Sequence, residues 1–134
     1  ITDIFIGGSC MNADQLFAIQ SEAIRDLAER ESCVIVGRCA EYVLRNHPHK
    51  ASIFITADYE DRVRYVMNHD NVDRTQAILT IEKGDKRRRS YHDYYATTRW
   101  GEARCYDLCI NSSHFGIEGT TDFICNYIKK RFGI

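Results

Sequence analysis

The sequence predicts an α/β fold in which helices cover both faces of a parallel sheet, giving three layers. Three short apolar runs, at 33–37, 52–56 and 106–110, are continuously apolar, as in parallel strands that are buried on both faces. Helical patterns lie between and around these runs. The order is helix, strand, helix, strand, two helices, strand, helix, which predicts right-handed crossovers between parallel strands.

Each expected helix has a capping residue or an apolar stripe at helical spacing. The clearest helix starts from a cap at Asn12 or Asp14 and keeps 3.6-residue apolar spacing as far as Arg30. A shorter one ends before Pro48, because the residue that precedes proline is steered out of the helical region. The five expected ranges are 12–30, 40–45, 58–67, 73–83 and 116–131. The first ten residues are interpreted as a loop, so the opening strand and helix of such a fold are absent.

Composition limits the classes of function. A chain of 134 residues with 44% apolar and 28% charged residues predicts one folded domain, 1–134. The net charge of -1 supplies no general basic field, so nucleic acid is not an expected partner. The apolar runs are too short to span a membrane.

The six cysteines form no Cys-x-x-Cys pair, so no zinc site is expected and no metal ligands are identified. Cys33, Cys105 and Cys109 are expected to be small buried hydrophobic residues, in a reducing cytoplasm.

A glycine and an arginine stand where the first apolar run ends. Ligands of open α/β sheets bind at the carboxyl ends of strands, so Gly37 and Arg38 suit a phosphate or a carboxylate. A glycine needed for helix packing and a solvated arginine are an equally good interpretation.

The run from Lys83 to Arg89 has six charged residues in seven, five of them basic. Lys83, Lys86 and Arg87 share one helical face if the helix continues through Gly84. Crowded like charges favour a polyphosphate partner, although a solvated basic stretch is the alternative.

Aromatic residues follow the basic run, at Tyr91, His92, Tyr94, Tyr95 and Trp100. They could stack on a base or simply pack a helix against the domain. The polar turn from Asn111 to Ser113 ends the last apolar run and could line a ligand cleft.

Four segments together, in this order and spacing, resemble the cytidylate kinase-like family of bacterial P-loop kinases. They are VIVGR (34–38), SIFITADYEDRV (52–63), GDKRRRSYHDYY (84–95) and YDLCINSS (106–113). The resemblance covers nearly the whole chain from about residue 14. It implies a nucleoside monophosphate kinase-like fold, ATP as phosphoryl donor with Mg²⁺, and a basic lid.

The resemblance also implies roles for individual residues. Gly37 and Arg38 match the step that holds the acceptor's phosphate. Asp85 and Arg88 match the last two members of an Arg-x-x-x-Asp-x-x-Arg lid pattern, and Lys86 and Arg87 would lie in the same lid, which we expect to span 83–104. We therefore expect Asp85, Arg87 and Arg88 to be catalytic and Lys83 and Lys86 to bind phosphate. Asn111 and Ser112 would lie near the nucleotide base.

The sequence departs from the family pattern in three places. Cys39 stands where cytidylate kinases have an aspartate that reads cytosine, which leaves the acceptor open. Ile81 replaces the first arginine of the lid pattern, for which Lys83 could compensate. No G-x-x-x-x-G-K-[ST] loop occurs, and Gly7-Gly8 lacks the following lysine.

The expected function is ATP-dependent phosphoryl transfer to a nucleoside monophosphate or a similar small acceptor, with the 134 residues inactive alone. The alternative is a non-catalytic nucleotide- or anion-binding regulatory domain on a kinase scaffold. An RNA-binding module that uses the basic and aromatic stretch is a third interpretation.

Overall fold

The computed structural model describes the backbone of residues 4–6 and 9–134 and the side chains from Asn12 onward. The chain divides into two compact units, residues 1–48 and 49–134, and each is described by itself. The expectation of a single domain therefore stays a prediction.

The first unit contains a hairpin and two helices. Strands β1 (Ile4–Ile6) and β2 (Ser9–Met11) pair antiparallel, so the expectation of a loop over the first ten residues is wrong there. Gly7-Gly8 lies outside the described residues. Helix α1 (Ala13–Arg30) begins where expected, because Asn12 and Gln15 form a reciprocal capping box. Helix α2 (Ala40–Val43) packs on it through Ile24.

The predicted strand at 33–37 is wrong. This segment has no strand partner in the part of the chain that the structure describes, and the side chains of Val34 and Val36 are 93% and 88% exposed. Because a strand is defined by its neighbours, an apolar run with nothing to pair with stays irregular. Cys33 is exposed for the same reason, so its predicted burial is also wrong.

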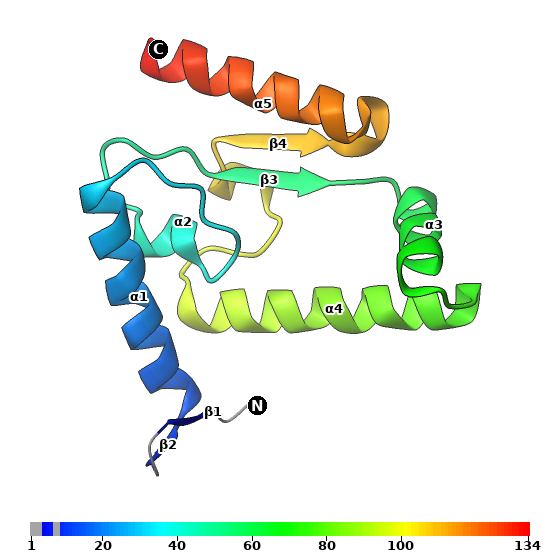
Figure 1. The fold of residues 1–134 in the computed structure, drawn as a ribbon, viewed down its shortest axis with the longest axis horizontal. Helices are drawn as coiled ribbons and strands as arrows, with labels where there is room; N and C mark the ends of the chain where they lie inside the picture. Colours follow the sequence, from blue (N-terminus) through cyan, green and yellow to red (C-terminus); the bar gives the residue numbers. More distant parts are fainter. Residues whose placement is uncertain (1–3, 7–8) are drawn as a thin grey trace. The chain divides into compact units, whose positions relative to one another are not determined.

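The second unit is a two-stranded parallel sheet with helices around it (Figure 1). Strands β3 (Ile53–Thr56) and β4 (Leu108–Asn111) pair with Ile53 opposite Leu108 and Thr56 opposite Asn111. The predicted strands at 52–56 and 106–110 and their parallel pairing are thus confirmed. Both strands end at the same edge. Cys109 is exposed, against expectation, and Cys105 is half-buried.

Three helices and two short 3-10 turns complete this unit. Helices α3 (Tyr59–Asp70) and α4 (Arg74–Tyr95) lie between the strands in sequence, and α5 (Gly116–Phe132) follows β4. The turns are η1 (Ala103–Cys105) and η2 (Ser112–His114). Helix α4 starts directly after Asp73, close to its predicted start, and continues through Gly84 and the basic run. The described chain is therefore a mixed α/β structure with five α-helices and a small parallel sheet.

The core of the second unit lies between α3 and α4. Val63, Ala77 and Ile81 are buried there, and Val66 and Met67 pack against them. Ile81 thus occupies an interior position, which explains why an apolar residue stands there. Burying a side chain of this size contributes about 1.5–3 kcal/mol.

Asp107 ties the start of β3 to α5. Its carboxylate accepts hydrogen bonds from the Ser52 N–H at 2.7 Å and the Ser52 hydroxyl at 2.9 Å, and it pairs with Arg131 at 3.1 Å. Burial works to raise the pKa of Asp107, but Ser52 and Arg131 outweigh it and hold that pKa below its usual range.

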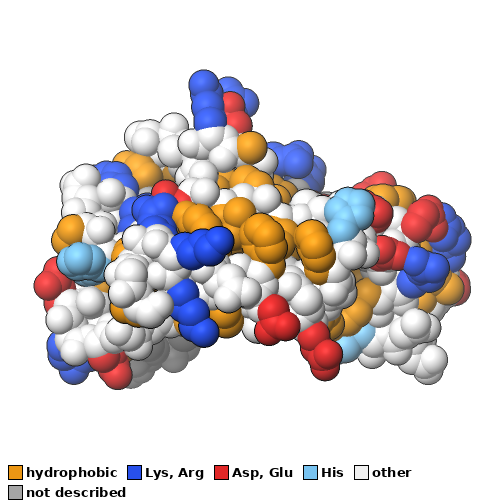
Figure 2. All heavy atoms as spheres, turned by 90° about the horizontal axis from the view of Figure 1, so that it is seen from above, with side chains coloured by type: hydrophobic (Ala, Val, Ile, Leu, Met, Phe, Trp, Pro, Cys, Tyr) orange, Lys and Arg blue, Asp and Glu red, His pale blue; other side chains and the backbone are white. Residues whose placement is uncertain are grey.

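Figure 2, which looks onto the molecule from the side of α5, shows a band of hydrophobic side chains beside Lys and Arg. Exposed apolar residues around α5 include Phe115, Ile117 and Phe123. None of the helices that the structure describes is long and apolar enough to cross a membrane.

Candidate functional site

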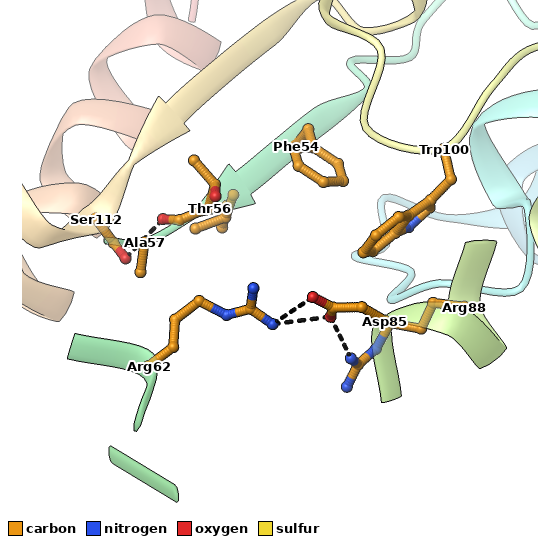
Figure 3. Close-up of a pocket in the computed structure, with 9 residues that line it drawn as sticks. Phe54, Thr56, Ala57, Arg62, Asp85, Arg88, Trp100 and Ser112 are labelled. Carbon is orange, nitrogen blue, oxygen red and sulfur yellow. Dashed lines mark hydrogen bonds and ion pairs between the residues drawn. The ribbon is translucent and has the colours of Figure 1, made fainter. Parts of the chain in front are cut away.

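A cleft of about 310 Å³ opens at the carboxyl end of β3, inside the second unit (Figure 3). The end of β3, the first turn of α3, the middle of α4 and the segments around β4 all contribute to it. Its lining residues are Phe54, Ile55, Thr56, Ala57, Arg62, Asp85, Arg88, Trp100 and Ser112. This position agrees with the expectation that ligands bind where parallel strands end.

Three charged side chains form the polar end of the cleft. Arg62 Nη2 donates to both carboxylate oxygens of Asp85 at 2.8 Å, and Arg88 Nη1 donates to Asp85 Oδ1 at 3.3 Å. The side chains of Arg62 and Asp85 are 32% and 23% exposed, so the pair is partly shielded from water. One carboxylate balances one of two guanidiniums. The cluster keeps one net positive charge, directed at the cleft.

The helical spacing of α4 explains why Asp85 and Arg88 face inward. They lie on the same face as Ile81 and His92, which are both buried. Gly84 adds room for Arg88, because a Cβ at this position would lie 3.1 Å from Arg88 Nη1. The sequence thus presents Arg88 without a side chain crowding it from the preceding turn.

Three other basic residues of the run lie on the outer side of α4. Lys83, Lys86 and Arg87 are exposed, none lines the cleft, and none forms an ion pair with the described residues. They do share one helical face, as expected. Lys83, which could compensate for the lid arginine that Ile81 replaces, does not line the cleft. The expected lid, 83–104, consists of the second half of α4 and the loop that follows, and its mobility stays a prediction.

The turn from Asn111 to Ser113 joins the ends of the two strands. Asn111 Nδ2 donates to Asp58 Oδ1 at 2.8 Å, and the Asp58 N–H donates to Ser113 Oγ at 2.8 Å. Ser112 Oγ donates to the carbonyl of Thr56 at 3.0 Å and lines the cleft. Ser112 therefore reaches the site, whereas the Asn111 side chain holds the turn.

An aromatic group forms the other end of the cleft. The ring of Phe54 meets Trp100 edge to face at 5.4 Å and Tyr106 at 5.0 Å. The Trp100 N–H donates to Asp93 Oδ1 at 2.8 Å, which anchors the loop to α4. This hydrogen bond is the main reason that the pKa of Asp93 lies below its usual range.

Gly37 and Arg38 lie in the first unit, in a turn that precedes α2. Gly37, Arg38 and Cys39 have φ angles of +72°, +57° and +55°. Consecutive left-handed residues other than glycine cost about 1–2 kcal/mol each, and such strain is often kept at functional sites. The side chain of Arg38 is exposed and that of Cys39 is buried. Their role towards a phosphate stays a prediction.

Sequence reasoning missed Arg62. Arg62 lies within the segment SIFITADYEDRV, but nothing in the spacing distinguishes it from Arg64, which is exposed and pairs with Asp61 on the same helix. Only the packing of α3 against α4 turns Arg62 towards Asp85. Among the described residues no group of three or more His, Cys, Asp or Glu side chains could hold a metal ion.

Comparisons with known proteins bear on the fold and on the family of the chain. The crystal structure of an uncharacterized protein from Eubacterium ventriosum ATCC 27560 is similar, with a TM-score of 0.84 and 38% sequence identity over 87% of this chain and 73% of that chain. No curated protein matches the chain. Residues 2–114 match the model of one protein family. Since that match covers most of the 134 residues, the chain belongs to the cytidylate kinase-like family.

Proposed function

We propose that the chain takes part in ATP-dependent phosphoryl transfer to a nucleoside monophosphate or a similar small acceptor. The observation that carries this is the cluster of Arg62, Asp85 and Arg88 at the carboxyl end of a parallel strand. Family membership supports a nucleotide-related, kinase-like function, and the cluster supplies chemistry that such a function needs.

Two guanidiniums held by one carboxylate suit phosphate binding. A phosphate oxygen would bind the N–H groups of Arg62 and Arg88 that Asp85 does not use, while Asp85 keeps both side chains oriented. Phosphoryl transfer depends mainly on placing the phosphates in line and neutralising their charge. The cluster would supply fixed positive charge for that purpose.

Asp85 therefore has a positioning role in this proposal rather than that of a base. Its carboxylate already accepts hydrogen bonds from two arginines, so it is poorly placed to bind Mg²⁺. Mg²⁺ in kinases is held largely by substrate phosphates with one or two carboxylates, and ATP would bring it in that form. Arg38 and Gly37 would hold the acceptor's phosphate, and Lys83, Lys86 and Arg87 would add charge around the lid.

The finer fold prediction belongs to the same proposal. A three-layer sheet of the nucleoside monophosphate kinase type would cover Val34 and Val36 with neighbouring strands.

Binding and transfer can be tested separately. Calorimetry on the 134-residue chain with CMP, AMP and ATP–Mg²⁺ measures binding, and an ATP-dependent assay of this chain and of longer forms with a glycine-rich loop measures transfer. Binding with transfer in a longer form supports the kinase. Binding without transfer in every well-folded form would support the regulatory alternative, and absence of binding would refute both.

A further inference from the structure

The cleft has two chemically different ends, and the arginines account for only one of them. Arg62 and Arg88 suit an anion, whereas Phe54 and Trp100 form an apolar, aromatic wall in the same cleft (Figure 3). We propose that Trp100 is the residue against which the ligand's flat base stacks, so that the ligand is a phosphate joined to an aromatic ring. This inference rests on the proposed function and assigns one side chain to base recognition.

The indole of Trp100 is held in place before any ligand arrives. Its backbone N–H is fixed by Asp93, and its ring lies 5.4 Å from that of Phe54 at an angle of 81°. The next residue, Gly101, has φ +76°, and a Cβ there would lie 3.2 Å from Phe54 Cζ. The turn can approach Phe54 this closely because Gly101 lacks a side chain. Figure 3 shows the indole directed into the cleft, between Phe54 and Asp85.

The neighbouring aromatic residues are used differently. Tyr95 packs against Tyr91 at 5.0 Å and against Tyr94 at 4.7 Å, outside the cleft. His92 is buried at 5% exposure. Within the described chain, Trp100 is the one aromatic side chain of the 91–100 stretch that lines the cleft. The structure thus separates a binding role for Trp100 from packing roles for the others.

A nearby cation does not explain the position of Trp100. The guanidinium of Arg89 lies 5.8 Å from the indole centroid, close to the outer limit of about 6 Å for a cation–π contact. Arg89 is an exposed residue, so this contact is weak in water. Base stacking on an aromatic side chain contributes more, about 1–3 kcal/mol, and accepts any base.

The chain provides its own probe, because Trp100 is its single tryptophan. We would titrate the 134-residue chain with CMP, AMP, ribose 5-phosphate and inorganic pyrophosphate, and record calorimetry and tryptophan emission together. CMP and AMP are expected to bind and to quench Trp100. Ribose 5-phosphate and pyrophosphate are expected to bind through the arginines without quenching.

Variants test the energetic contribution. Trp100→Ala should weaken the binding of CMP and AMP about tenfold, which corresponds to the lower part of the range for a stacked base. It should change the affinity for ribose 5-phosphate less than about twofold. Trp100→Phe keeps an aromatic ring, so it should lose less nucleotide affinity than Trp100→Ala. It replaces the alanine variant in this test if that variant folds poorly. Tyr94→Ala is the control, because Tyr94 is aromatic, 71% exposed and outside the cleft.

The outcomes separate this inference from the proposed function. The assignment of Trp100 is overturned if CMP and AMP bind in calorimetry without quenching its emission and bind Trp100→Ala or Trp100→Phe as tightly as the unchanged chain. Nucleotide binding itself would then still stand. Quenching by ribose 5-phosphate equal to that by CMP overturns the assignment too. Ribose 5-phosphate has no base, so the emission of Trp100 would then respond to phosphate binding and not to stacking. Failure of all four compounds to bind overturns the proposed function and the stacking role together.

Discussion

Replacing Arg62 with alanine tests the cationic end of the cleft most directly. The change removes two hydrogen bonds of 2.8 Å to Asp85 and lowers the charge of the cluster from one net positive to zero. Arg88 would remain as the sole partner of the carboxylate, at 3.3 Å.

Two different magnitudes follow. A charge-assisted hydrogen bond contributes about 1.5–3 kcal/mol, and an exposed ion pair about 0–1 kcal/mol. The pair with Asp85 is partly shielded, so Arg62→Ala should lower the free energy of unfolding by about 1–2 kcal/mol. Loss of a guanidinium contact to phosphate should weaken pyrophosphate and CMP binding roughly ten- to hundredfold.

Urea unfolding and calorimetry measure these two effects, and Arg64→Ala is the matched control. Arg64 lies on the same helix, its side chain is 71% exposed, and it pairs with Asp61 outside the cleft. It should change stability by less than about 0.5 kcal/mol and leave binding unaltered. Unchanged affinity in Arg62→Ala would refute the role of Arg62. An equal loss of affinity in Arg64→Ala would show that only overall charge matters.

Three further predictions concern the surroundings of the cleft. Gly84→Ala should favour α4 by up to about 1 kcal/mol yet weaken pyrophosphate binding, because its Cβ displaces the Arg88 guanidinium; stronger binding would contradict this. Gly101→Ala should destabilise the fold by about 1–3 kcal/mol in thermal unfolding, because its backbone is left-handed and its Cβ crowds Phe54; an unchanged melting temperature would count against it. The pKa of Asp107 is lowered in the fold, so its stabilising contribution is complete above about pH 4 and declines as the pH falls through the lower folded value. Urea unfolding from pH 6 to pH 2 should show this decline, and Asp107→Asn should flatten it; equal pH profiles would disprove the contribution.

Several elements could be predicted from sequence because their signals are local. The capping box of Asn12 and Gln15 fixes the start of α1, and Asp73 caps α4 through the N–H of Gln76. Continuous apolar runs predicted β3, β4 and their parallel pairing. Family-like motifs directed attention to Asp85, Arg88 and Ser112, which the structure brings to one cleft.

Other features depend on residues far apart in sequence. The run at 33–37 has the composition of a strand, but pairing requires a neighbour that composition does not supply. The Asp58 side chain accepts from Asn111, 53 residues away, and makes no hydrogen bond to cap α3. Residues close in sequence therefore predict neither the lack of pairing at 33–37 nor the partner of Asp58.

From the amino-acid sequence one can predict where most helices begin, that the runs at 52–56 and 106–110 form parallel strands, and the resemblance to the cytidylate kinase-like family. Capping, apolar periodicity and motif order act over short stretches of chain, so they can be read without a structure. Only tertiary packing decides that Arg62 faces Asp85 while Arg64 does not. It also places Arg88 in the cleft and leaves Lys83, Lys86 and Arg87 outside it. Of the aromatic residues at 91–100, it brings Trp100 to the cleft. The direction of a side chain is set by what its element packs against, and that information lies in the contacts between distant segments.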